Sequence, residues 1–179
     1  MLTVGHKFPE FSLKSVVANE MPHAFSLVST ADMIGRWNVV FFYPKDFTFV
    51  CPTELQGFDE LMKAFSARKT GVYGVSTDSE FVHLAWRRDA KELRNLSYPL
   101  VSDIKRELSM ALGILDAKEG VCLRATFIVD PEGIIRHVSV NDLSVGRNPE
   151  EILRVLDALQ VGGLMPCRWQ PGQEAIKVA

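Results

Sequence analysis

The sequence predicts an α/β fold in which a mixed β-sheet has helices on both faces. Two observations support it. Apolar, β-rich runs alternate with segments of helical period, and a β-hairpin followed by one more helix closes the pattern. The length of 179 residues suits one domain with a sizeable core, and 47% apolar with 23% charged residues is typical of globular proteins.

The first predicted strand and helix flank a short loop. The run "WNVVFFYP" at 37–44 is apolar apart from Asn38, as in a strand that is buried on both faces. The segment 51–68 has helical period, and its apolar side chains form one stripe: Leu55, Phe58, Leu61, Met62 and Phe65. Gly71 follows and is expected to end this helix.

Two further strand–helix units follow along the chain. "GVYGVSTD" at 71–78 is a second predicted buried strand, and 79–93 is a predicted helix with Ser79 near its cap. "YPLVSD" at 98–103 is a short strand that precedes a short helix over 104–112.

A hairpin and a last helix complete the pattern. "RATFIVDPEGIIRHVSV" at 124–140 contains two strands joined by the turn "DPEG", with proline at its second position and glycine at its fourth. The helix over 149–159 has Asn148 as its expected cap and Pro149 at its first position. From Gly162 onward the chain is predicted to be irregular.

This order fits a thioredoxin-like sheet flanked by helices, with a domain at 1–160 and a C-terminal tail at 161–179. A formal net charge of −2 leaves no basic surplus for nucleic acid or an anionic membrane. The first residues lack the basic-then-apolar pattern of a signal peptide, and no apolar run is long enough to span a bilayer. We therefore expect a cytoplasmic protein.

The cysteines are few and odd in number: Cys51, Cys122 and Cys167. Such a set is not a secreted disulfide scaffold, so a disulfide here would be transient and catalytic. The spacings match no zinc motif and the four histidines are scattered, so no metal site is expected. Nothing in the chain suggests a haem or flavin cofactor.

Cys51 lies where a strand and loop lead into a helix. Pro52 suits the first helical position, and free N–H groups together with the helix dipole favour a thiolate at Cys51. Thr48 can place its hydroxyl beside the sulfur. The alternative is a small buried apolar residue at a helix start. Glu54 fills the place of a second C-x-x-C cysteine, which disfavours a disulfide reductase. A tyrosine phosphatase is disfavoured as well, because it would need a glycine-rich phosphate cradle with an arginine directly after the cysteine.

"FYPKDFTFVCPTE" resembles the signature of peroxiredoxins, in which Pro44, Thr48 and Cys51 follow P-x-x-x-T-x-x-C. The resemblance runs from Val4 to about Gly172, and it includes "GVSTDSEFVHLAW", "LVSDIKREL", "RATFIVDPEGIIRHVSV" and "GRNPEEILRVLDALQ". The segments are most similar to those of typical two-cysteine peroxiredoxins of the bacterial alkyl hydroperoxide reductase C type.

The resemblance implies a thiol peroxidase that reduces hydrogen peroxide and organic hydroperoxides in antioxidant defence. Cys51 would be the peroxidatic cysteine, whose thiolate attacks the peroxide and becomes a sulfenic acid. Thr48 would form a hydrogen bond with the peroxide, and Pro44 would shield the sulfur from water. A holdase chaperone or a redox-sensing binding protein on the same scaffold is the alternative function.

Arg124 matches the family's active-site arginine, whose charge would stabilise the thiolate and the breaking O–O bond. The alternative for Arg124 is a cation at a strand start that pairs with a surface carboxylate. Glu54 and Arg147 match a supporting pair that orients this arginine.

The resolving cysteine is where this sequence departs from the family pattern. Trp169 suggests that Met165 occupies the usual cysteine position, and Cys167 lies two residues later. A shift of two extended residues moves the sulfur by about 6–7 Å. We expect Cys167 to resolve Cys51 across a dimer interface, although Cys167 could instead meet the external reductant.

Cys122 is a second candidate for the resolving role. If the strand of Arg124 already starts at Cys122, period-two alternation puts both side chains on one face. The alternative is an inert, partly buried residue.

The resemblance also implies partners. Phe47, Thr77 and Trp86 lie in a region where family dimers pack into rings of five or six dimers. A flavoprotein disulfide reductase, thioredoxin or a small alkylhydroperoxidase D-type protein would fit as the reductant.

Overall fold

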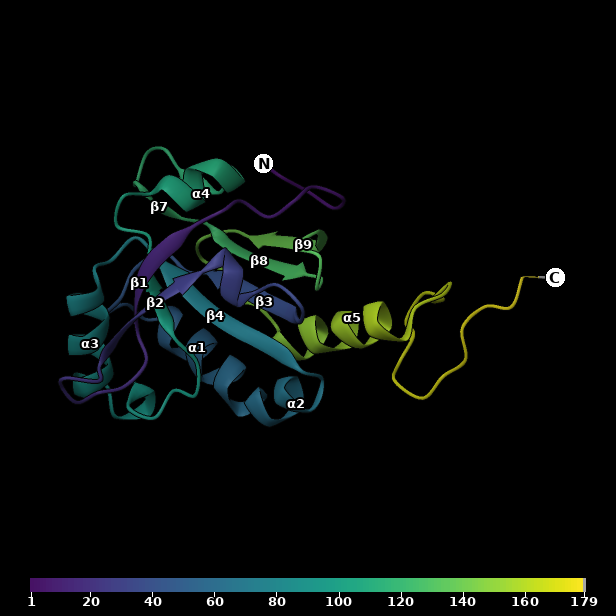
Figure 1. The fold of residues 1–179 in the computed structure, drawn as a ribbon, viewed down its shortest axis with the longest axis horizontal. Coiled ribbons are helices and arrows are strands. Elements are labelled where there is room, and N and C mark those ends of the chain that lie inside the picture. The colour runs from purple at the N-terminus through teal and green to yellow at the C-terminus, as the bar shows by residue number, and fades with distance from the viewer. Residues whose placement is uncertain (179) are drawn as a thin grey trace.

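The computed structural model describes residues 1–178 and shows a seven-stranded mixed sheet with helices on both faces (Figure 1). The strand order is β2-β1-β5-β4-β3-β8-β9. The three strands β5, β4 and β3 run parallel, and every other pairing is antiparallel. The seven strands are β1 (Ser12–Val16), β2 (Phe25–Ser29), β3 (Trp37–Phe42), β4 (Thr70–Ser76), β5 (Leu100–Ser102), β8 (Arg124–Val129) and β9 (Ile135–Asn141). The predicted fold class is confirmed.

The core forms two layers, one on each face of the sheet. On β3, Val39 and Phe41 point to the layer under α1 (Cys51–Glu60), α2 (Met62–Ala67), α3 (Glu80–Asp89) and α5 (Pro149–Val161). Val40 and Phe42 point to the other layer, under α4 (Glu107–Leu112) and the N-terminal segment. Because β3 is buried on both faces, its sequence is apolar from Val39 to Phe42 rather than alternating.

The predicted helix over 51–68 is interrupted at Leu61, so it forms α1 and α2. The prediction that Gly71 ends it is wrong. Lys69 adopts the left-handed conformation after α2, with φ 51°, and Gly71 already lies in β4. Gly71 is needed there for a close approach, because a Cβ atom would lie 2.9 Å from Oδ1 of Asn38.

The predicted helix over 79–93 forms α3 and a separate 3-10 helix at Lys91–Leu93, because Ala90 between them is extended. The other two predicted helices differ from the structure only at their ends. Ser79 caps α3 through the N–H of Val82, and Asn148 caps α5 as expected. The helix α4 begins at Glu107 rather than 104, because Arg106 is left-handed with φ 62°. The carboxylate of Asp103 accepts hydrogen bonds from the first turn of α4.

Two hairpins were not predicted. β1 and β2 pair in antiparallel register from Ser12↔Ser29 to Val16↔Phe25 and form one edge of the sheet. β6 (Leu115–Asp116) and β7 (Val121–Cys122) form a separate two-stranded hairpin. These strands are five and two residues long, too short for a clear period.

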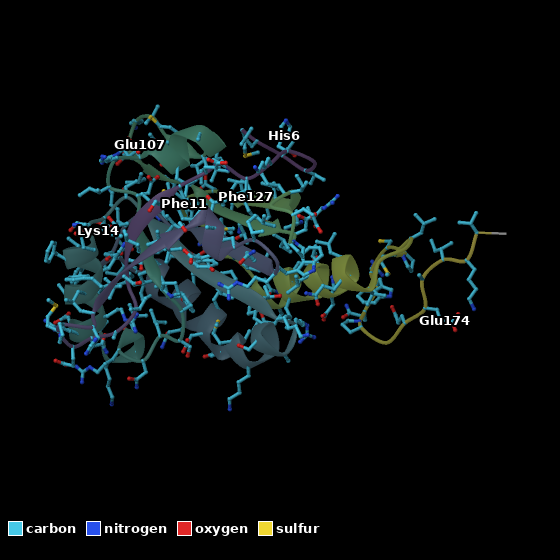
Figure 2. The ribbon with its side chains drawn as sticks, in the orientation of Figure 1. His6, Phe11, Lys14, Glu107, Phe127 and Glu174 are labelled. Carbon is cyan, nitrogen blue, oxygen red and sulfur yellow. The ribbon has the colours of Figure 1, made fainter. Side chains whose placement is uncertain are left out.

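The tail leaves the body of the protein after α5 (Figure 1). Glu174 on this tail lies far from Phe127 in the middle of β8 (Figure 2). Up to residue 178 the tail contains turns and one isolated bridge between Leu164 and Ile176, which fits the predicted irregular segment. None of the described helices has the length and apolar character needed to cross a membrane.

Candidate active site

Cys51 is the first residue of α1 and lies at the floor of a cavity of about 520 Å³. The cavity brings four of the predicted site residues together, since Pro44, Thr48 and Arg124 line it with Cys51. Its other lining residues are Lys45, Phe49, Val50, Asp116, Lys118, Glu119, Val121 and Leu143. Cys51 itself is fully buried, so the cavity is its route to solvent.

The start of α1 differs in detail from the prediction. Pro52 is the second helical residue rather than the first. The N–H groups of Thr53 and Glu54 both donate to the carbonyl of Val50, at 3.1 and 3.3 Å. Those two donors are therefore used inside the helix. The positive charge beside Cys51 comes instead from a side chain on another element.

That side chain is Arg124, at the first position of β8. Its Nη1 donates to Sγ of Cys51 at 3.5 Å and to Oε2 of Glu54 at 2.6 Å. Its Nε donates to the carbonyl of Leu143 at 2.7 Å. Arg124 is buried, and so is its carboxylate partner, so the alternative of a surface ion pair is wrong.

Glu54 connects Arg124 to Arg147. Arg147 contacts both carboxylate oxygens of Glu54, through Nε at 2.8 Å and Nη2 at 2.9 Å. Its Nη1 donates to the carbonyl of Phe42 at 2.7 Å, which attaches the cluster to the end of β3. Two guanidinium groups and one carboxylate leave a net charge of +1 beside the sulfur.

Thr48 lies on the cavity wall, but its hydroxyl donates to the carbonyl of Lys45 at 2.9 Å. A hydroxyl keeps its lone pairs when it donates. Thr48 can therefore accept a hydrogen bond from a ligand in this position, whereas donating to one requires the hydroxyl to rotate away from Lys45.

A buried polar network, which the sequence did not reveal, holds the loop between β3 and α1. Oδ2 of Asp46 lies 2.7 Å from Nδ1 of His83, and the hydroxyl of Tyr43 donates to Oδ1 of Asp46 at 2.9 Å. The N–H of Asp46 donates to Asp78 at 2.9 Å. Burial raises the pKa of Asp46, and the bond to His83 opposes that rise. The sequence offered one signal for this network, namely the position of His83 in the predicted helix over 79–93.

The other two cysteines do not lie with Cys51. Cys122 is buried in the core layer on the opposite face of the sheet, and burial raises its pKa to about 12. The expected alternation with Arg124 fails because β7 ends at Cys122 and the chain turns at Leu123. Cys167 is exposed on the tail and does not line the cavity.

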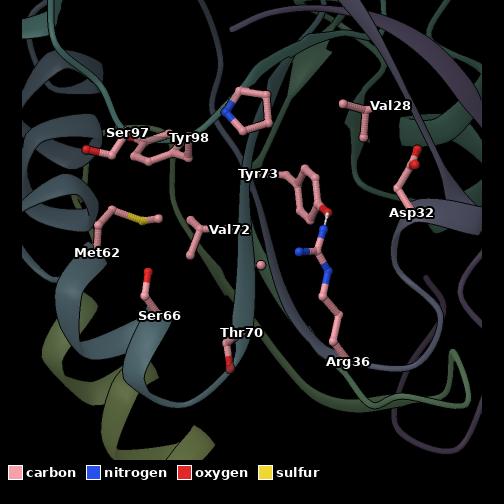
Figure 3. Close-up of a pocket in the computed structure, with 12 residues that line it drawn as sticks. Val28, Asp32, Arg36, Met62, Ser66, Thr70, Val72, Tyr73, Ser97 and Tyr98 are labelled. Atoms are coloured by element: carbon pink, nitrogen blue, oxygen red, sulfur yellow. Dashed lines mark hydrogen bonds between the residues drawn. The ribbon is translucent and has the colours of Figure 1, made fainter.

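The remaining features suggest no second centre. Within residues 1–178, no group of three or more His, Cys, Asp or Glu side chains could hold a metal ion. A second cavity, of about 350 Å³, lies between α2 and β4 (Figure 3). Nη2 of Arg36 donates there to the hydroxyl of Tyr73 at 2.6 Å. None of the predicted site residues lines this cavity.

Comparisons with known proteins agree on one family. The model of the AhpC/TSA family matches residues 4–138. The chain is 48% identical to alkyl hydroperoxide reductase C of Mycolicibacterium smegmatis, over 98% of this chain and 94% of the relative. Its fold is similar to that of Mycobacterium tuberculosis AhpC, with a TM-score of 0.84 and 47% identity; the match covers 89% of this chain and 99% of that chain. It is also similar to that of reduced Plasmodium vivax 2-Cys peroxiredoxin, with a TM-score of 0.91 and 36% identity; this match covers 99% of this chain and 94% of that chain.

Proposed function

The chain belongs to the AhpC/TSA family of peroxiredoxins, and we propose that Cys51 is the peroxidatic cysteine of its thiol-dependent peroxidase reaction. The substrates are hydrogen peroxide and organic hydroperoxides, and a thiol reductant completes the cycle. One observation carries the assignment: Cys51 opens a helix at the floor of a cavity, with the guanidinium of Arg124 at 3.5 Å from its sulfur.

The first step is a displacement at the terminal peroxide oxygen. The Cys51 thiolate attacks this oxygen, an S–O bond forms and the O–O bond breaks. The departing oxygen takes a proton and leaves as an alcohol or water, and Cys51 becomes a sulfenic acid. Arg124 stabilises the negative charge that develops on the departing oxygen. Thr48 contacts the peroxide, and Pro44 limits the access of water.

Glu54 and Arg147 act as positioning residues for Arg124. Glu54 accepts from both guanidinium groups, and Arg147 is fixed by main-chain carbonyls. Arg124 therefore has little freedom before the peroxide arrives. Such preorganisation avoids reorganising the site at the moment of reaction.

The second step uses Cys167 of the partner subunit. Its thiol attacks the sulfenic acid of Cys51, a disulfide forms and water leaves. Two features support an intersubunit reaction: Cys167 is exposed on the tail, and it does not line the cavity of its own chain. A reductant protein then cleaves the disulfide. A flavoprotein disulfide reductase, thioredoxin or an alkylhydroperoxidase D-type protein fits this role.

We also propose a homodimer that assembles into a ring of five or six dimers. The ring of Phe47 is half exposed and packs against Trp86 with 5.9 Å between centroids, and Thr77 directly follows β4. The proposed domain spans 1–160 and the tail 161–179, and the proposed location is the cytoplasm.

The assignment of Cys51 is tested with a Cys51→Ser variant and a competent reductant. Peroxide consumption should disappear in this variant and persist in Cys122→Ser. Retained consumption in Cys51→Ser would contradict the assignment. A holdase chaperone, the alternative function, would keep its activity in Cys51→Ser, so an aggregation assay on the same variant separates the two functions.

The resolving residue is tested by non-reducing electrophoresis and mass spectrometry after peroxide treatment. We expect a Cys51–Cys167 link between chains that is absent in Cys167→Ser. A Cys51–Cys122 link within one chain would overturn the assignment of Cys167.

A further inference from the structure

The cavity above Cys51 is much larger than hydrogen peroxide requires. Its volume is about 520 Å³, whereas a water molecule occupies roughly 30 Å³. Much of the wall is apolar, formed by Pro44, Phe49, Val50, Val121 and Leu143. Phe49 is 94% exposed, so its ring offers an apolar surface to a ligand. The site therefore has room for the alkyl part of an organic hydroperoxide.

The β6–β7 hairpin forms one rim of this cavity and is held firmly. Oδ1 of Asp116 accepts from the N–H groups of Lys118 and Glu119, at 2.9 and 2.8 Å. The N–H of Gly120 donates to the carbonyl of Asp116 at 2.8 Å. Nε of Arg106, just before α4, donates to the carbonyl of Gly120 at 2.8 Å. The rim residues therefore have defined positions relative to the cavity floor.

The charges on this rim are not equally available to a ligand. Nζ of Lys45 lies 3.8 Å from Oε2 of Glu119, which pairs these two groups across the mouth. One carboxylate oxygen of Asp116, Oδ1, accepts hydrogen bonds from the turn. Lys118 lines the cavity, is exposed, and forms no ion pair with any residue within 1–178. Lys118 is therefore the rim cation that is free to meet an anion.

From this arrangement we propose that Lys118 is a specificity-determining residue, which recognises a carboxylate at the far end of an organic hydroperoxide. The hydroperoxide group reaches Cys51 at the floor, the alkyl chain lies along the apolar wall, and the carboxylate meets Lys118 at the rim. The inference rests on the proposed role of Cys51. The redox step is unchanged, and the carboxylate leaves unaltered with the alcohol product.

The bond between Lys118 and the ligand is a partly solvated ion pair, so its effect is modest and sensitive to salt. Removing the ammonium group should lower the preference for the acid roughly two- to five-fold. Raising the ionic strength from roughly 50 mM to roughly 500 mM should also lower the preference of the wild-type protein for the acid, because salt screens exposed charges.

The test compares an alkyl hydroperoxide that carries a terminal carboxylic acid with its methyl ester of equal chain length. The measured quantity is the ratio of kcat/KM for the acid to kcat/KM for the ester. We expect this ratio to fall in Lys118→Ala and to fall further in Lys118→Glu. Lys63→Ala is the matched control, because Lys63 is an exposed lysine on α2 that does not line the cavity.

Provided that both substrates are still consumed, the inference would be overturned by an unchanged acid-to-ester ratio in Lys118→Ala. An equal fall of this ratio in Lys63→Ala would also overturn it. Failure of the proposed function has a different signature: neither hydroperoxide is consumed by the wild-type protein, or consumption persists in Cys51→Ser. The two failures are therefore distinguishable.

Discussion

Replacing Arg124 tests the electrostatic basis of the reaction most directly. Its Nη1 lies 3.5 Å from Sγ of Cys51. Full charges at that separation and an effective dielectric constant of 20 interact by about 5 kcal/mol. Glu54 neutralises part of this charge, so Arg124→Ala should raise the activation free energy by about 2–4 kcal/mol, or lower the rate roughly 30- to 1000-fold.

The assay is the second-order rate constant for Cys51 oxidation, measured by stopped-flow tryptophan fluorescence or by competition with a reference peroxidase. Arg124→Lys should recover only part of the rate, because one ammonium group cannot contact Glu54, Leu143 and Cys51 as the guanidinium does. Arg88→Ala is the matched control, because it also removes one arginine but from the exposed face of α3.

Folding is checked separately by urea denaturation. Glu54 keeps Arg147 as its partner when Arg124 is removed, so the native fold should persist. A rate constant for Arg124→Ala within threefold of wild type, in folded protein, would refute the electrostatic role.

Three further predictions concern stability and reactivity. Glu54→Ala leaves Arg147 and Arg124 buried without a carboxylate and should lower the free energy of unfolding by roughly 3–5 kcal/mol, measured by urea denaturation. Burial raises the pKa of Cys122 to about 12, so at pH 8 iodoacetamide should label exposed Cys167 in native protein and reach Cys122 only after denaturation; native labelling of Cys122 would contradict its placement. Burial lowers the pKa of His137 below 6.5, with Glu151 opposing the shift and Arg154 assisting it. The unfolded chain then binds more protons as the pH falls through 6.5, so acid should destabilise the fold through His137. His137→Gln should flatten this slope in thermal melts below pH 6.5.

The sequence anticipated the local parts of the site better than the distant ones. The strand, loop and helix around Cys51 lie within one short segment, and their period and composition suffice to predict them. The role of Arg124 came only from the family resemblance, because Glu54 lies 70 residues before it and no local pattern joins the two. The network of Asp46 and His83 was missed for the same reason, since these residues lie 37 positions apart.

The cysteine at position 122 shows a different limit. Alternation predicts a shared face only while a strand continues, and the turn at Leu123 ends it. A sequence pattern cannot locate the end of this strand, because a strand of two residues is too short to show a period. The sheet then places Cys122 and Cys51 on opposite faces.

By itself, the sequence determined an α/β fold, a reactive cysteine at a helix start and a family, because these depend on period, local spacing and motif. Only the tertiary structure decided how the charged groups around Cys51 contact one another, which cysteines lie apart from it, and which lysine at the mouth of its cavity has no ion-pair partner within residues 1–178. Those features depend on contacts between segments far apart in the chain, and their geometry exists only after the sheet has assembled.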